Sequence, residues 1–203
     1  MIQRTFGCYR FVFNRYLAMR IEAYKTDKST VNYNACSADM TVLKKELNWL
    51  KEVDATALQS SLRDLDNAYQ NFFRRIKQGE KPGFPKFKSK HNSRKSYKSK
   101  RVGNNIAVLD NLVKFPKLGF VRCAVSKRVD GRILSATVSQ NPSGKYFVSI
   151  CCTDVDIPQY ESTSVAVGID MGLKDFAITS GGQVFENHRH LKKSEKKLAK
   201  LQR

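Results

Sequence analysis

Asp170 is the residue of this sequence whose type and setting most directly indicate chemistry. It follows the apolar run 165–169 and precedes Met171-Gly172. The run predicts a buried strand, and the glycine predicts a turn that leaves the carboxylate exposed at a sheet edge on a rigid backbone. Carboxylate oxygens are preferred ligands of Mg²⁺, so metal binding is one interpretation. A turn or capping role is the other, because aspartate favours such positions.

A complete nuclease site requires more than this one acid. Hydrolysis of phosphodiesters by two metal ions needs several carboxylates within a few ångström of one another. Asp175 lies five residues after Asp170, so the two-residue period of a strand predicts that it faces the opposite side. The other nearby acids and histidines have no spacing that predicts convergence: Glu186, Glu195, His188 and His190. We therefore expect the chain alone to be catalytically inactive.

The positive charge is concentrated in one segment. The net charge is +19, and residues 74–101 hold 12 Lys or Arg against one Asp or Glu. Such a concentration predicts contact with phosphates, the alternative being a solvated linker. Phe84, Phe87 and Tyr97 lie among the cations and could stack on bases, and prolines 82 and 85 predict an extended arm or ordered loop. The candidate contacts are Arg74, Arg75, Lys77, Lys86, Lys88, Lys90, Lys98, Lys100 and Arg101.

Other compartments and site types are disfavoured. No apolar run approaches the roughly 20 residues that span a bilayer, and no signal peptide pattern is present, so we expect no membrane association and a cytoplasmic location. The five cysteines form no C-x-x-C pair, which favours reduced structural thiols over disulfides or a zinc site.

The amino-terminal part has helical periodicity. Apolar residues recur at helical spacing over 6–24, 40–50 and 58–76, with Asp54 as the expected N-cap of the third helix. These stripes predict the core of a small helical bundle. Tyr33, Ser37 and Gln59 lie near the starts of the second and third helices, where they are either base-reading residues or ordinary caps and surface residues.

From residue 105 the period changes to two. Residues 106–108 and 112–115 flank Asp110-Asn111 and predict a hairpin. Further strands are expected at 118–126, 132–140 and 145–154, giving a compact antiparallel sheet or small barrel. A polar connector begins at Pro158 and marks the clearest domain boundary.

The segment Gly168-Ile169-Asp170-Met171-Gly172-Leu173-Lys174-Asp175-Phe176-Ala177 resembles the first strand pair of RuvC-type nucleases with the RNase H-like fold. It is most similar to the corresponding segment of TnpB proteins, also called OrfB, which insertion sequences encode and which are related to type V CRISPR effectors. The resemblance also covers residues 4–14, Trp49-Leu50 to Asp54, residues 57–59, Asn71-Phe72-Phe73, residues 83–87 and residues 114–119.

This resemblance implies an α+β multidomain protein. Its expected parts are a helical, helix-turn-helix-like recognition domain at 1–95 with the basic arm 74–101, a small antiparallel wedge-like β-barrel at 102–160, and the first strands of the RuvC domain at 165–203. Asp170 is then the first metal-binding catalytic acid, and Tyr33, Ser37 and Gln59 correspond to the surface that reads a short DNA motif. The implied activity is Mg²⁺-dependent, RNA-guided DNA cleavage in transposition and recombination, with guide RNA and target DNA as partners.

The sequence also departs from this pattern. Family members continue to a catalytic Glu, a zinc ribbon and a final catalytic Asp, whereas this sequence ends at Arg203 and lacks the usual first strand of the wedge domain. We expect an amino-terminal, truncated part of such an endonuclease, which a separately encoded carboxy-terminal half could complete. The alternatives are a non-catalytic RNA- or DNA-binding regulator and a gene remnant.

Overall fold

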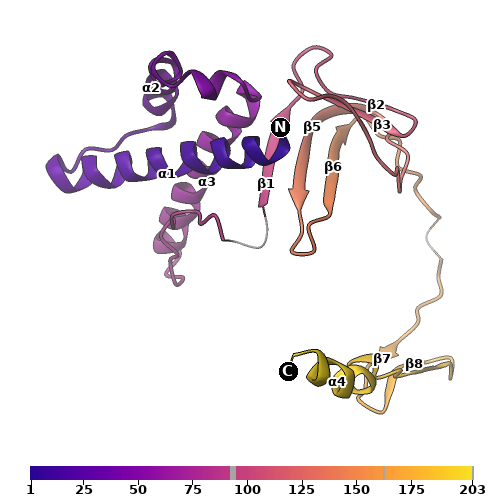
Figure 1. The fold of residues 1–203 in the computed structure, drawn as a ribbon. Coiled ribbons are helices and arrows are strands. Elements are labelled where there is room, and N and C mark those ends of the chain that lie inside the picture. Colours follow the sequence, from indigo (N-terminus) through magenta and orange to yellow (C-terminus); the bar gives the residue numbers. More distant parts are fainter. Residues whose placement is uncertain (92–94, 162, 203) are drawn as a thin grey trace. The chain divides into compact units, whose positions relative to one another are not determined.

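The computed structural model describes residues 1–91, 95–161 and 163–202. The chain divides into two compact units, Met1–Asp156 and Ile157–Arg203. In the described residues, the first unit holds helices α1 to α3 and strands β1 to β6, and the second holds strands β7 to β9 and helix α4 (Figure 1). The domain limits expected at 95 and 102 fall inside the first unit, while the polar connector at Pro158 follows its end.

The amino-terminal helices match the predicted periodicity. They are α1 (Ile2–Asp27), α2 (Tyr33–Glu46), the short 3-10 helix η1 (Asn48–Lys51) and α3 (Ala55–Lys77). Asp54 caps α3, since its carboxylate accepts a hydrogen bond from the Thr56 amide at 2.9 Å. The three predicted helices are thus confirmed, except that the second ends at Glu46, so Leu50 of its expected stripe lies in η1. None of the helices in the described part of the chain is long and apolar enough to cross a membrane.

One hydrophobic core lies among these helices. It is formed by α1, α2, η1 and α3, with Tyr16, Leu17, Leu50 and Leu58 fully buried. The hydroxyl of Tyr16 donates a hydrogen bond to Asp39 at 2.9 Å. Burial of four such side chains contributes roughly 1.5–3 kcal/mol each before conformational entropy is subtracted, so this core holds the helices together.

Two three-stranded antiparallel sheets complete the first unit. One has the order β1-β5-β6 and the other β2-β3-β4. Their strands are β1 (Lys95–Lys100), β2 (Ala107–Leu109), β3 (Leu112–Phe115), β4 (Gly119–Arg122), β5 (Arg132–Gln140) and β6 (Tyr146–Thr153). The predicted hairpins are confirmed at Asp110-Asn111 and at residues 141–144. The prediction of a wedge-like barrel is wrong in one respect, because the described strands of this unit form two open sheets and do not close into a barrel.

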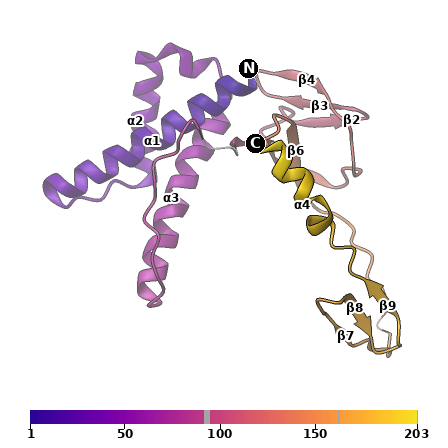
Figure 2. The ribbon, with the colours of Figure 1, turned by 60° about the horizontal axis from the view of Figure 1, so that its bottom comes forward.

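The sheets and helices share a second core. Phe6, Tyr9 and Ala57 from the helices pack with Tyr97, Ile106, Val113, Phe115, Ala136 and Val138 from the β region. The Phe6 and Tyr97 rings lie edge to face with centroids 5.5 Å apart. Helix α1 therefore buries residues on two sides, one toward the helical core and one toward the strands (Figure 2).

The second unit is small and open. It contains β7 (Ile169–Asp170), β8 (Asp175–Thr179) and β9 (Val184–Glu186) in one antiparallel sheet, followed by α4 (His190–Leu201). Residues 165–168, expected to belong to a buried strand, lie outside β7 and are exposed, and among the described residues of this unit Ala177 alone is buried. The sheet confirms the predicted turns at Gly172 and Gly181-Gly182, but it does not by itself show the RuvC fold.

Candidate nucleic-acid interface

The base-reading candidates lie on adjoining faces of α2 and α3. Tyr33 and Ser37 are one helical turn apart on α2, and Gln59 and Arg63 are one turn apart on α3. The two faces meet where the Arg63 guanidinium carbon lies 3.7 Å from the centroid of the Tyr33 ring. Tyr33 and Ser37 are half-buried, while Gln59 and Arg63 are exposed. The sequence reasoning missed Arg63, although its spacing of four from Gln59 was a readable signal.

The basic segment has three structural parts. Residues 74–77 form the last turn of α3, residues 78–91 form an irregular loop, and residues 95–100 form strand β1. The prediction of an extended arm or ordered loop therefore holds only for the middle part; the last part is built into a sheet. Arg94 lies outside the described residues. The candidate cations are exposed: Arg74, Arg75, Lys77, Lys86, Lys88, Lys90, Lys98, Lys100 and Arg101.

A tight turn after α3 sends the loop back along the helix. The Gly79 amide donates to Ile76 O at 3.1 Å and the Glu80 amide donates to Arg75 O at 2.9 Å. This is the Schellman pattern, in which the residue after the cap adopts the left-handed region. Gly79 does so, with φ of 71°. The loop then runs back beside α3 toward α1 (Figure 2).

Asn14 anchors this loop to α1. Its side-chain Nδ2 donates to Lys88 O at 3.0 Å, and its Oδ1 accepts from the Lys88 amide at 2.8 Å. The Lys88 ammonium lies 4.4 Å from the Phe13 ring centroid and 5.2 Å from that of Tyr9. Desolvation there lowers the pKa of Lys88, and the nearby charge of Asp64 opposes the shift. Lys88 is thus exposed as a residue, like Lys86 and Lys90, but its ammonium lies over two aromatic rings.

Strand β1 separates cations from core residues by its two-residue alternation. Lys98 and Lys100 are exposed, whereas Tyr97 and Ser99 are buried. The expectation that Tyr97 could stack on bases is therefore wrong: its ring packs against Phe6, and burial raises the pKa of its hydroxyl to about 12. Ser99 donates a hydrogen bond to the carboxylate of Asp54, which ties the strand to the start of α3.

Asp170 ends strand β7 in the second unit. It pairs with Ile178 of β8 and is exposed, and no hydrogen bond of its carboxylate is found among the described residues. The register differs from the expected one for Asp175. A bulge between Asp175 and Ala177 places Asp175 opposite Glu186, so that both follow the face on which Asp170 and Ile178 lie. One residue inserted into the strand reverses the face that simple counting predicts.

Sharing a face does not create a metal site. Among the described residues, no group of three or more His, Cys, Asp or Glu side chains is placed to hold a metal ion. Asp170 is separated from the Asp175–Glu186 pair by intervening positions along the strands. The described carboxylates of this unit therefore do not form a two-metal centre by themselves. His188 and His190 have ring centroids 5.4 Å apart without joining such a group.

Comparison with known proteins supports the nucleic-acid assignment. A family model described as a helix-turn-helix domain, from OrfB proteins, matches residues 1–29. The chain is 36% identical over 205 residues to "Putative RNA-guided DNA endonuclease InsQ" of Escherichia coli (strain K12), covering 100% of this chain and 49% of the relative. It is 33% identical over 207 residues to "Putative RNA-guided DNA endonuclease" of Streptomyces pristinaespiralis, covering 100% of this chain and 50% of the relative.

The chain is thus similar to OrfB proteins over its first 29 residues and to two putative RNA-guided DNA endonucleases over its whole length. It spans about half the length of the curated relatives that it matches. The segment that matches the OrfB helix-turn-helix model forms a single continuous helix, α1, followed by the Lys28 cap. The matched segment therefore covers one helix and its cap, and the next helix, α2, begins at Tyr33, beyond the match.

Proposed function

We propose that this chain is the nucleic-acid-binding part of an RNA-guided DNA endonuclease of insertion sequences, acting on guide RNA and target DNA. The observation that carries the proposal is the row of exposed cations that begins in the last turn of α3, continues along the anchored loop and ends on β1. Cations fixed on an ordered scaffold bind phosphates at a smaller entropic cost than cations on a free tail. The names of the two relatives support the choice of RNA and DNA as partners.

Within this proposal, the Tyr33–Arg63 surface binds duplex DNA. Tyr33, Ser37 and Gln59 supply hydrogen-bonding groups that suit base edges, and Arg63 supplies a guanidinium held by an aromatic ring. A planar cation fixed in this way can bind a phosphate or the edge of a guanine. The cations of the basic segment then contact the backbone of RNA or of an RNA–DNA duplex.

Asp170 is proposed as one ligand of a Mg²⁺ ion, the metal that the resemblance to RuvC-type nucleases implies. Its exposed, unpaired carboxylate suits a metal ligand, while the described residues do not complete a site. We therefore assign binding, and not cleavage, to the chain by itself. A separately encoded second half of the enzyme would supply the other carboxylates in this scheme.

The alternative function is a non-catalytic regulator that occupies RNA or DNA. It is favoured by the same open carboxylate geometry, because binding by the cations needs no metal. The two functions are separated by adding the second half of a related enzyme, with its guide RNA and a matching DNA target, in the presence of Mg²⁺. Cleavage that is lost in Asp170→Asn supports the endonuclease, and tight binding without any cleavage supports the regulator.

A further inference from the structure

Four aromatic rings form a partly exposed cluster at the end of α3, and it includes Phe84, one of the aromatic residues expected to stack on bases. The rings are those of Tyr69, Phe72, Phe73 and Phe84, and each contacts two others. Tyr69 lies 6.4 Å from Phe73 and 5.7 Å from Phe84, while Phe72 lies 5.2 Å from Phe73 and 5.3 Å from Phe84, centroid to centroid. Three come from the helix and the fourth from the loop. The turn at Gly79 therefore builds the cluster by folding the loop back on the helix.

One side of the cluster packs against the helical core, and the other side is exposed to solvent. Tyr69 packs against the helical core, and the Arg20 guanidinium carbon lies 5.1 Å from its ring centroid. Arg20 itself is buried and pairs with Asp66 at 3.1 Å. By contrast, Phe73 is 58% exposed and Phe84 is 46% exposed. The neighbouring exposed rings make a contiguous apolar patch on a fixed base, and such patches mark binding surfaces.

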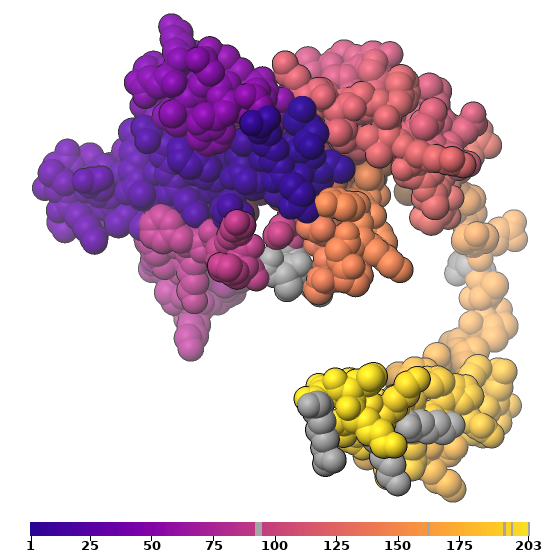
Figure 3. Space-filling model, in the orientation of Figure 1, coloured from indigo at the N-terminus to yellow at the C-terminus, as the bar shows by residue number. Residues whose placement is uncertain are grey.

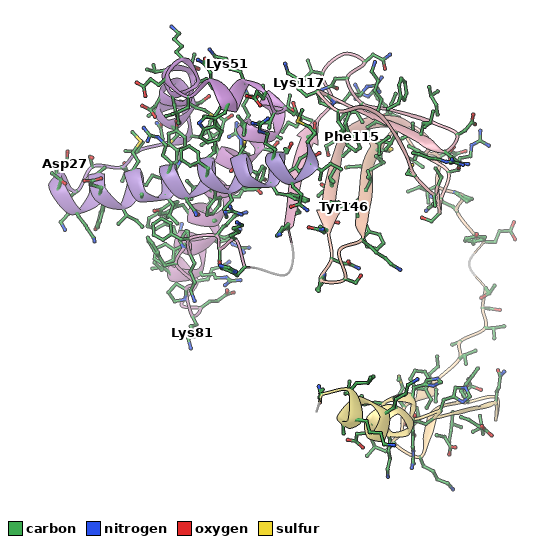
Figure 4. The ribbon with its side chains drawn as sticks, viewed as in Figure 1. Asp27, Lys51, Lys81, Phe115, Lys117 and Tyr146 are labelled. Atoms are coloured by element: carbon green, nitrogen blue, oxygen red, sulfur yellow. The ribbon has the colours of Figure 1, made fainter. Side chains whose placement is uncertain are left out.

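The surroundings of the cluster are cationic. Arg74, Lys77, Lys81 and Lys86 are exposed within a few residues of Phe73 or Phe84, while Glu80, the one acid of the basic segment, lies 3.8 Å from Arg75. Figure 4 shows Lys81 at the tip of the loop that follows α3, and Figure 3 shows this part of the chain projecting beyond α1. An apolar protein segment would make no favourable contact with these surrounding cations. A nucleic acid would bind through both, because its bases stack on the rings and its phosphates pair with the cations.

We propose that the four-ring cluster is a stacking platform for unpaired bases of a single-stranded nucleic acid, with Phe73 and Phe84 as the stacking rings. The inference rests on the proposed nucleic-acid function and adds to it a site and a strand state. Duplex bases are already stacked on each other, so the platform selects single strands. The chemistry is shared by RNA and DNA strands, and the experiment below separates them.

The test uses the full chain and four probes: a single-stranded RNA, a single-stranded DNA of the same sequence, the duplex of that DNA, and the single-stranded DNA with one 2-aminopurine. Phe73→Leu and Phe84→Leu keep an apolar side chain but remove the ring. Each is expected to weaken binding to the single strands by roughly tenfold or more, since one base stack contributes that much. Binding to the duplex and the slope of affinity against salt should not change, because no charge is removed.

Three further measurements make the result decisive. Phe73→Trp keeps an aromatic ring and should bind single strands as the wild type does. The fluorescence of 2-aminopurine should be quenched by the wild type but not by Phe84→Leu. Phe147→Leu is the matched control, because Phe147 is 52% exposed on β6 and lies outside the cluster. If the leucine variants lose more affinity for single-stranded RNA than for single-stranded DNA, the platform binds RNA. If they lose more affinity for the DNA, it binds DNA.

Two outcomes would overturn the platform. In the first, both leucine variants bind single strands as tightly as the wild type, which would indicate that the rings contact a protein and not a nucleic acid. The other is an equal loss for single strands and duplex, which would show a structural role. If the wild-type chain binds none of the probes, the proposed function itself fails, and that result is distinct from both.

Discussion

The guanidinium carbon of Arg63 lies 3.7 Å from the centroid of the Tyr33 ring, which joins a side chain on α3 to one on α2. The contact holds the Arg63 guanidinium against a half-buried ring that packs on the helical core. It also fixes a positive charge beside the hydrogen-bonding groups of Ser37 and Gln59. A cation–π contact at an exposed site contributes about 0.5–1 kcal/mol, enough to preorganise a binding surface without determining the fold.

Arg63→Met is expected to weaken duplex DNA binding and leave thermal stability nearly unchanged. The variant keeps the length of the side chain but loses the charge, so the slope of log affinity against log salt should fall in magnitude by roughly 0.9. Fluorescence anisotropy at several salt concentrations measures this. The matched control is Lys25→Met near the end of α1, which should bind as the wild type does. Equal slopes for Arg63→Met and the wild type would remove Arg63 from the interface.

Asn14→Leu is expected to release the basic loop from α1. The substitution deletes both hydrogen bonds to Lys88, at 3.0 and 2.8 Å, while the helix remains a good context for leucine. Trypsin should then cut after Lys86, Lys88 or Lys90 several times faster than in the wild type, because the loop opens more often. Asn34→Leu on the exposed side of α2 serves as the control. Unchanged cleavage rates would show that the loop is held by other contacts.

Two glycines give opposite predictions for the same substitution. Gly79 has φ of 71° in the turn after α3, so Gly79→Ala should destabilise the fold by about 1 kcal/mol. Gly7 lies inside α1 with nothing within 4 Å of an added Cβ, so Gly7→Ala should stabilise it by roughly 0.5–1 kcal/mol. Urea unfolding measures both changes. The turn geometry described for Gly79 is contradicted if both variants shift stability in the same direction.

Asp54→Ala is expected to lower the free energy of unfolding by more than the loss of an ordinary helix cap does. The carboxylate accepts from the Thr56 amide at 2.9 Å and also from the Thr56 and Ser99 hydroxyls, so it couples α3 to β1. We expect a loss of about 2 kcal/mol in unfolding free energy, since a buried hydroxyl is left without its acceptor. Asn32→Ala removes the cap of α2 without any link to a sheet and should cost about 1 kcal/mol. Equal costs would argue against the coupling.

The elements that the sequence predicted well are those with local signals. Helical spacing, the Asp54 cap and the turn residues at 110–111 and 141–144 each act over a few residues, and the helices and hairpins lie where these signals indicate. The basic segment was also visible, because its charge needs no tertiary information. The course of its loop depends on the Asn14–Lys88 contact across 74 residues and its strand on pairing with β5, and no local pattern encodes either.

The errors have a common physical origin in long-range packing. Tyr97 is interleaved with lysines and resembles a surface aromatic in sequence, yet antiparallel pairing with β5 turns it toward Phe6. Asp175 was assigned to the wrong face because a bulge between Asp175 and Ala177 inserts one residue into the strand. The four-ring cluster joins residues on either side of a turn. The relation of Phe84 to Tyr69 and Phe72 therefore needed the structure.

The central claim, that the segment from α3 through β1 binds phosphates, is tested most directly by the salt dependence of binding to a single-stranded RNA and a duplex DNA. Lys77, Lys86 and Lys98 are changed to Gln together, and a control chain carries the same substitution at Lys25, Lys51 and Lys117, which removes equal charge elsewhere. Figure 4 labels Lys51 and Lys117, which lie away from the loop tip at Lys81. The account predicts a loss in slope of roughly 0.7–0.9 for each phosphate contact in the first variant and little change in the control. Equal slopes for the two variants would contradict the account, because the position of a lysine would then have no influence on its contribution to binding.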